Sequence, residues 1–158
     1  MVPREAKRSR TEIREELGFA EDDFILIHLS NLRPVKRVDD VLKVVHALKD
    51  NPRVKLLVLA GDLFEPFEPL VKDLGLCDRV VVRHNVVDIE NYIAASDAGI
   101  YASERESFGM GVLETMSFGK PVVATEGRGR GRRSWSTARP VFCAAWGMSH
   151  NWRRRCAS

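Results

Sequence analysis

The amino-acid sequence predicts a doubly wound α/β fold built on a parallel sheet. Short runs such as residues 24–29 and 54–60 have the continuous hydrophobicity of strands that are buried on both faces. Segments with helically spaced apolar residues lie between these runs. Polar clusters follow the runs, where sheets of this class bind ligands. Together these observations predict a ligand site at the carboxyl ends of the strands.

The expected elements alternate regularly along the chain. A charged amphipathic helix is expected at about residues 5–17, because apolar residues recur four apart and Gly18 can end a helix. A polar loop joins the strand at residues 24–29 to a helix at about residues 38–49. The further expected elements are strand 54–60, a helix at about 65–74, strand 80–83, a short helix at about 88–95, strand 98–101, a helix that follows Glu106 and ends at Gly119, and a strand at 121–125.

Charge divides the chain into two parts. Residues 1–126 hold all 22 acidic and 17 of the 25 basic residues, whereas residues 127–158 hold eight Arg and no acidic residue. The formal net charge of +3 therefore says nothing about the partners of the folded part. We expect residues 1–126 to form one domain and residues 127–158 to be a disordered, Arg-rich tail.

Cysteine usage and hydropathy indicate the compartment. Cys77 is the only cysteine in residues 1–126, which fits a reduced cytoplasm better than a disulfide scaffold. No segment reaches the roughly 18 apolar residues of a membrane span. Residues 1–4 do not begin a signal peptide. A cytoplasmic protein without a membrane span is expected.

A basic loop follows the first expected strand. Residues 31–37 (NLRPVKR) place Arg33, Lys36 and Arg37 within five residues. Such a loop suits a diphosphate, because arginine offers a planar fork of donors and lysine a compact charge. A solvated basic loop that leads into a helix is the alternative.

Two further loops carry candidate residues. Gly61 and Asp62 end the second strand, and Asp62 either faces a ligand or caps the next helix. Arg83 begins an Arg-His-Asn cluster at the end of the third strand. His84 is expected at the surface and His28 in the core, and neither is expected to act as an acid or a base.

Segment 106–114 (ESFGMGVLE) carries two glutamates eight positions apart at the entrance of a helix. Two carboxylates at different depths suit a ligand with two separated sets of hydroxyls, such as a nucleotide sugar. The backbone of Gly109 and the helix start supply N–H donors for a phosphate between them. A solvated loop Glu106 and a helix-surface Glu114 are the alternative.

The glutamate spacing resembles the E-x7-E motif of retaining, two-domain glycosyltransferases with the GT-B fold, and the resemblance covers about residues 1–125. Residues 30–41 (SNLRPVKRVDDV) and 71–76 (VKDLGL) are most similar to the branch of N-acetylglucosaminyl-malate synthases of bacillithiol biosynthesis. The resemblance implies a Rossmann-like, carboxyl-terminal donor-binding domain that is incomplete at its C-terminus. It also implies that an amino-terminal, acceptor-binding domain is missing.

The resemblance implies roles for the candidate residues. Arg33 and Lys36 would neutralise the donor's diphosphate as the glycosidic bond breaks, although Asn31 occupies the family's usual arginine position. Glu106 would bind the hydroxyls of the sugar, and Glu114 would bind those of the ribose. The other donor-binding residues would be Asn31, Gly61, Asp62, Arg83, Ser107, Phe108 and Gly109.

The donor implied is a nucleoside-diphosphate sugar, UDP-N-acetylglucosamine in the most similar branch, transferred with retention. Leu63 stands where the family often has a second glycine after Gly-Asp. No cofactor and no metal ion are expected, because no set of His, Asp and Glu has ligand spacing and the cation pair can neutralise the diphosphate. By itself the fragment is expected to bind nucleotide weakly and to transfer no sugar.

The tail departs from the family after Glu126, and we predict a reading-frame slip there. The family continues with Gly-Gly-x-x-Glu and then Asp-Gly-x-Thr-Gly-Leu-Leu, whereas residues 127–135 read GRGRGRRSW. We translated the tail in the frame that joins the third base of each codon to the first two bases of the next codon. In this frame the genetic code leaves almost no choice at four positions, and the codons between them can encode the family segment. Val, Leu, Gly and Val then arise from Trp135–Ser136, Phe142–Cys143, Trp146–Gly147 and Met148–Ser149.

Other function classes stay open. The chain could be a nucleotide-binding module without chemistry, or an α/β core whose Arg/Gly tail binds nucleic acid through counterion release. Two Cys and three Trp in the tail do not favour a nucleic-acid partner. A regulatory domain of flavodoxin type is a further alternative, but no acidic triad follows the first strand.

Overall fold

The computed structural model describes residues 5–104, 109–125 and 140–143. In these ranges six strands form one sheet in the order β3-β2-β1-β4-β5-β6. The first five strands pair in parallel, and β6 pairs antiparallel with β5. The doubly wound parallel sheet predicted from the sequence is confirmed.

The strands are β1 (Phe24–Ser30), β2 (Val54–Ala60), β3 (Val80–His84), β4 (Ala98–Tyr101), β5 (Val122–Thr125) and β6 (Pro140–Cys143). The helices are α1 (Arg10–Leu17), α2 (Val38–Ala47), α3 (Glu68–Asp73), α4 (Ile89–Ala95) and α5 (Met110–Ser117), with 3-10 turns η1 (Pro34–Lys36) and η2 (Glu65–Phe67). Every helix and strand expected from the sequence in these ranges is present, with boundaries that differ by a few residues.

The largest boundary difference is the start of α1, which begins at Arg10 and not near residue 5. Ser9 is the N-cap, and its hydroxyl accepts a hydrogen bond from the amide of Glu12. The carboxylate of Glu12 in turn accepts from the amide of Ser9, which completes a capping box. The S-R-T-E sequence at residues 9–12 carries this signal.

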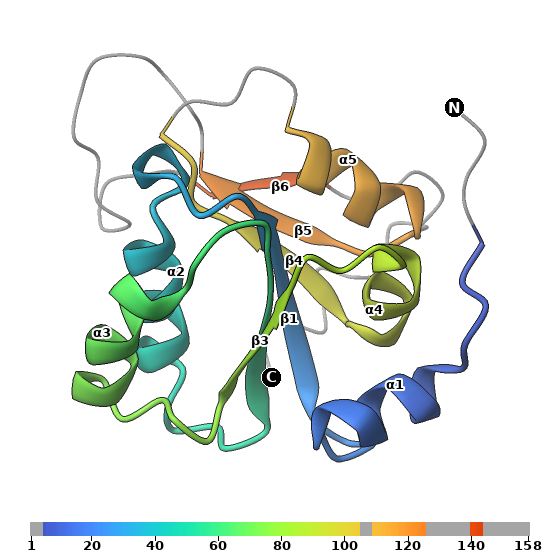
Figure 1. The fold of residues 1–158 in the computed structure, drawn as a ribbon, viewed down its shortest axis with the longest axis horizontal. Coiled ribbons are helices and arrows are strands. Elements are labelled where there is room, and N and C mark those ends of the chain that lie inside the picture. The colour runs from blue at the N-terminus through green and yellow to red at the C-terminus, as the bar shows by residue number, and fades with distance from the viewer. Residues whose placement is uncertain (1–4, 105–108, 126–139, 144–158) are drawn as a thin grey trace.

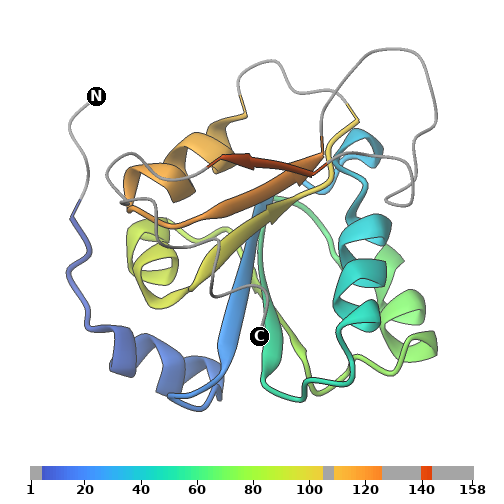
Figure 2. The ribbon, with the colours of Figure 1, turned by 180° about the vertical axis from the view of Figure 1, so that it is seen from behind.

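Helices cover both faces of the sheet (Figures 1 and 2). Helices α2 and α3 pack on one face, where residues such as Val41, Leu56 and Ile100 form one apolar core. Helices α1 and α4 pack on the other face around Ile13, Ile27 and related residues, and α5 lies on that side next to β4 and β5. The sheet is thus buried on both sides, as its continuous apolar runs require.

The direction in which the sheet grows reverses beside β1. Strands β2 and β3 extend the sheet on one side of β1, and β4 and β5 extend it on the other side. Seven residue pairs join β1 to β2, whereas the register between β1 and β4 covers only Leu26↔Ala98 and Ile27↔Gly99. Open α/β sheets bind ligands at such a switch point, beyond the carboxyl ends of the strands.

Most of the tail lies outside the described residues. Its described part is β6, which adds an antiparallel edge strand that we do not predict from the sequence. The expected reading-frame slip stays a prediction, and so does the expected disorder of residues 127–139 and 144–158, which lie outside the described residues. No helix in the described ranges is long and apolar enough to cross a membrane.

Candidate functional site

A cavity of about 590 Å³ opens at the switch point between β1 and β4. Its walls come from the carboxyl ends of β1 and β2, the loop after β1, the segment from β3 to the start of α4, and the first two turns of α5. Six of the residues predicted from the sequence line it, namely Asn31, Arg33, Lys36, Gly61, Gly109 and Glu114. The fold therefore brings together residues that are up to 83 positions apart in the chain.

Two predicted residues, Asp62 and Arg83, are not among those that line the cavity. The carboxylate of Asp62 accepts a hydrogen bond from the amide of Leu63 at 2.8 Å, within its own turn. The guanidinium of Arg83 donates to the carbonyl of Glu16 at 3.3 Å, at the end of α1. Their roles in donor binding stay predictions, as for three further residues that lie outside the described ranges: Glu106, Ser107 and Phe108.

The three cations of the loop after β1 have different surroundings. The guanidinium of Arg37 forms an ion pair with the carboxylate of Asp40 in the first turn of α2. Arg33 and Lys36 instead line the cavity. Leu32 anchors the loop, because its side chain is buried in the core although its φ is +55°. The loop after β4 is bonded to the loop after β1, since the amide of Glu104 donates to the carbonyl of Val35 at 2.8 Å.

The opposite wall is the start of α5. Gly109 is its N-cap with a φ of +59°, a left-handed conformation that favours glycine. The first N–H groups of a helix have no acceptor inside the helix and attract anions. A Cβ on Gly111 would lie 2.8 Å from a ring carbon of Tyr101 and 3.0 Å from the carbonyl oxygen of Leu29. Only a glycine at this position lets α5 approach β1 so closely.

Side-chain hydrogen bonds hold α5 against β4. The hydroxyl of Tyr101 lies 2.8 Å from the carbonyl oxygen of Gly111 and 2.7 Å from the hydroxyl of Thr115. The hydroxyl of Thr115 lies 2.7 Å from the same carbonyl oxygen. Tyr101 and Thr115 are both buried, so these bonds fix the first turn of α5 relative to the sheet.

The cavity also contains residues that were not predicted as site residues. Asn85 lines it with a φ of +51°, and its amide donates to the carbonyl of Ala60 at 3.0 Å. Val86 and Ile89 add apolar surface on the same side. An asparagine directly after a strand is the sequence signal for such a left-handed turn. The two apolar residues carry no comparable signal.

Within residues 5–104, 109–125 and 140–143, no group of three or more His, Cys, Asp and Glu could hold a metal ion. Among the described residues, the charged side chains that line the cavity are two cations and one carboxylate: Arg33, Lys36 and Glu114. Such a set can neutralise an anion and accept hydrogen bonds from hydroxyls.

Residues 9–132 match the family described as glycosyl transferases group 1. The chain belongs to this family. It is 38% identical over 120 residues to the N-acetyl-alpha-D-glucosaminyl L-malate synthase of Bacillus anthracis, covering 75% of the chain and 32% of that protein. It is 30% identical over 117 residues to the alpha-monoglucosyldiacylglycerol synthase of Streptococcus pneumoniae, covering 72% of the chain and 26% of that protein. The chain thus spans about a third or less of these relatives.

Solved structures agree on the fold. A structure of Anabaena Alr3699/HepE in complex with UDP and glucose matches with a TM-score of 0.68 at 29% identity, over 76% of the chain and 34% of that protein. The glycosyltransferase WaaG, which is involved in lipopolysaccharide biosynthesis, matches with a TM-score of 0.71 at 26% identity, over 79% of the chain and 34% of that protein. The fold is the Rossmann-like half of a GT-B glycosyltransferase.

Proposed function

We propose that this chain is the donor-binding part of a retaining glycosyltransferase that uses a UDP-linked sugar. The observation that carries the proposal is the cavity at the switch point, which sets Arg33 and Lys36 opposite the start of α5 and Glu114. The complex of the related HepE with UDP and glucose supports a uridine nucleotide. The relative that makes N-acetylglucosaminyl malate supports N-acetylglucosamine as the sugar.

In this proposal the diphosphate lies between the two walls. Arg33 and Lys36 pair with its oxygens from the loop after β1, and the first amides of α5 donate to it from the other side. The bond between the anomeric carbon and the β-phosphate oxygen breaks, and its electron pair stays on the phosphate. The acceptor hydroxyl forms the new bond on the same face, and its proton passes to the departing UDP. The cations stabilise the charge that develops, so the proposal includes no metal ion.

The two glutamates would orient the donor. Glu114 lines the cavity from the second turn of α5, where its carboxylate can accept hydrogen bonds from the ribose hydroxyls. Glu106 is proposed to accept hydrogen bonds from the hydroxyls of the sugar, and it lies outside the described residues. The eight-residue spacing supports this division, because it separates two carboxylates along one helix entrance.

Binding and transfer are expected to separate in this polypeptide. The chain spans about a third of the length of these relatives, so we propose that the acceptor binds to a further domain. The chain by itself should bind the donor weakly and transfer no sugar, because a closed site that excludes water is needed for transfer. We also propose a cytoplasmic location, which the exposed thiol of Cys77 supports because free thiols persist in a reducing compartment.

Calorimetric titration with UDP, UDP-N-acetylglucosamine, UDP-glucose and GDP tests the proposal. We expect the uridine nucleotides to bind and GDP to bind more weakly. Glu114→Gln should weaken UDP binding by about tenfold, because it replaces a charged hydrogen-bond acceptor. Glu15→Gln, at an exposed position of α1, is the matched control and should bind UDP like the unmodified chain. A folded protein that binds none of the uridine ligands would overturn the proposal.

A further inference from the structure

His28 lies on β1 next to Leu29 and Ser30, which line the cavity, and directly after the last residue pair between β1 and β4. Its side chain is fully buried. The register between these strands ends at Ile27↔Gly99, and from there the ring of His28 bridges the gap. Nδ1 of His28 lies 2.8 Å from the carbonyl oxygen of Ile100 on β4. Beyond the last backbone pair, a side-chain hydrogen bond thus connects β1 to β4.

The partners of His28 decide which ring nitrogen carries the proton. A carbonyl oxygen can only accept, so Nδ1 must be a donor to Ile100. In the neutral ring Nε2 is then an acceptor, and it lies 3.0 Å from the hydroxyl of Ser30. Ser30 therefore donates to His28, and its oxygen accepts from the amide of Leu32 at 3.1 Å. Three hydrogen bonds thus run in one direction: from the amide of Leu32 to Ser30, from Ser30 to His28, and from His28 to Ile100 on β4.

The chain of contacts joins both walls of the cavity. On one side it ends at Ser30, which lines the cavity, and at Leu32, which anchors the loop of Arg33 and Lys36. On the other side the ring of His28 packs on the ring of Tyr101, with centroids 5.4 Å apart. The hydroxyl of Tyr101 bonds to the first turn of α5, as described above.

We propose that His28 is a positioning residue, which holds the cationic loop after β1 at a fixed place relative to the start of α5 by way of Ser30. This inference rests on the proposed function, because the diphosphate is what would lie between the two walls. The uridine base and the ribose would contact other parts of the cavity. His28 should therefore affect the affinity for the diphosphate and leave the affinity for the nucleoside unchanged.

The first test is spectroscopic. Long-range ¹H–¹⁵N correlation of the histidine rings reports the tautomer of each neutral imidazole. We expect His28 to carry its proton on Nδ1, with Nε2 as the acceptor, and Ser30→Ala to perturb the Nε2 signal. A ring protonated on Nε2 alone would contradict the contact to Ile100 and with it the proposed relay.

The second test compares UDP with uridine in matched variants. His28→Asn keeps a donor near Nδ1 but cannot reach Ser30, whereas His28→Gln can place its amide oxygen near Nε2. We expect His28→Asn and Ser30→Ala to weaken UDP binding by about three- to tenfold, the range of one hydrogen bond, without changing uridine binding. His28→Gln should recover part of the loss, and the His28→Asn/Ser30→Ala double variant should lose no more than Ser30→Ala alone.

The outcomes separate the two claims. If the unmodified chain binds no uridine nucleotide, the proposed function fails and the inference fails with it. If the unmodified chain binds UDP, and the folded variants Ser30→Ala and His28→Asn bind UDP as tightly as the unmodified chain does, only the inference fails. A loss that is the same for UDP and uridine would show a general packing role and would also overturn the inference. Ser30→Ala keeps the test decisive if the His28 variants do not fold.

Discussion

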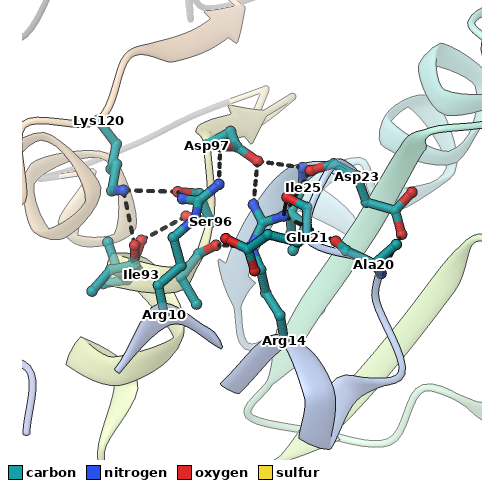
Figure 3. A network of polar contacts seen from close by, with 12 residues as sticks. Arg10, Arg14, Ala20, Glu21, Asp23, Ile25, Ile93, Ser96, Asp97 and Lys120 are labelled. Atoms are coloured by element: carbon teal, nitrogen blue, oxygen red, sulfur yellow. Dashed lines mark hydrogen bonds and ion pairs between the residues drawn. The ribbon is translucent and has the colours of Figure 1, made fainter. Parts of the chain in front are cut away.

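Two arginines at opposite ends of the strands differ in their surroundings. At the amino ends of the strands, here called the amino edge, Arg14 is 1% exposed and donates five hydrogen bonds (Figure 3). At the carboxyl ends, here called the carboxyl edge, Arg33 is exposed and lines the cavity. Arg14 bonds to the carboxylate of Asp97 and to backbone carbonyls that lie just before β1 and β4. The carboxylate of Asp97 also accepts from Arg10 and from the amide of Ile25. Charge at this edge joins α1 to the starts of two strands.

Lys120 extends the same network toward β5. Its ammonium donates to the carbonyls of Ala94 and Ser96 at 2.9 and 2.8 Å. Burial lowers the pKa of Lys120, and the neighbouring charge of Arg10 lowers it further. Cations at the amino ends of the strands thus fix the fold, whereas Arg33 and Lys36 at the carboxyl ends face a cavity. Variants at the two edges should therefore fail in different ways.

Replacing Arg14 should have the largest effect. Arg14→Met would remove the charged partner that Asp97 has in the interior and the side-chain donor of four backbone carbonyls, and we expect a loss of about 3–5 kcal/mol of unfolding free energy. Urea denaturation followed by circular dichroism measures this loss. Arg10→Met is the control, because Arg10 is partly exposed and should cost much less. Equal effects of the two variants would contradict the structural role assigned to Arg14.

Gly111→Ala tests the link between fold and site at the carboxyl edge. The new Cβ would overlap the ring of Tyr101 and approach the carbonyl of Leu29, so α5 must shift away from β1. We expect a cost of about 1–3 kcal/mol in stability together with clearly weaker UDP binding. Gly119→Ala is a useful comparison, since Gly119 has open space around its Cβ position but a φ of +70°. That variant should lose stability through backbone strain and keep its affinity for UDP.

Acid should reveal the smallest effect, at the start of α1. Hydrogen bonds from the amide and then the hydroxyl of Ser9 lower the pKa of Glu12. A lowered pKa stabilises the fold above the ordinary carboxyl pKa of about 4.3, and this contribution is lost as the pH falls through the lowered value. Thermal unfolding between about pH 5 and pH 2 should show a smaller pH dependence in Glu12→Gln, and Ser9→Ala should reduce it as well. An unchanged slope in both variants would argue against the capping box.

The sequence predicted the alternation of strands and helices, and hence the parallel sheet, because buried strands and amphipathic helices have recognisable local hydrophobic patterns. It also predicted Lys36 and Glu114 at the cavity, because both follow strands whose carboxyl ends meet at one edge. The network around Arg14 left no such signal, since an arginine in a charged helix gives no sign of burial. The position of Gly111 left no signal either, because it depends on how closely α5 approaches β1 in three dimensions. The core position of His28 was predicted and is confirmed, but its contacts with Ile100 and Ser30 were not predicted. Distances between elements decide these roles.

In the proposed function, cations at the carboxyl ends of the strands bind a nucleoside diphosphate. The decisive experiment for this claim is calorimetric titration of Lys36→Ala with UDP, beside Lys72→Ala at an exposed position of α3. We predict that Lys36→Ala loses about tenfold or more in affinity, because a charged hydrogen bond to phosphate is lost. Lys72→Ala should bind UDP like the unmodified chain. Equal UDP affinities in the two variants would contradict the claim.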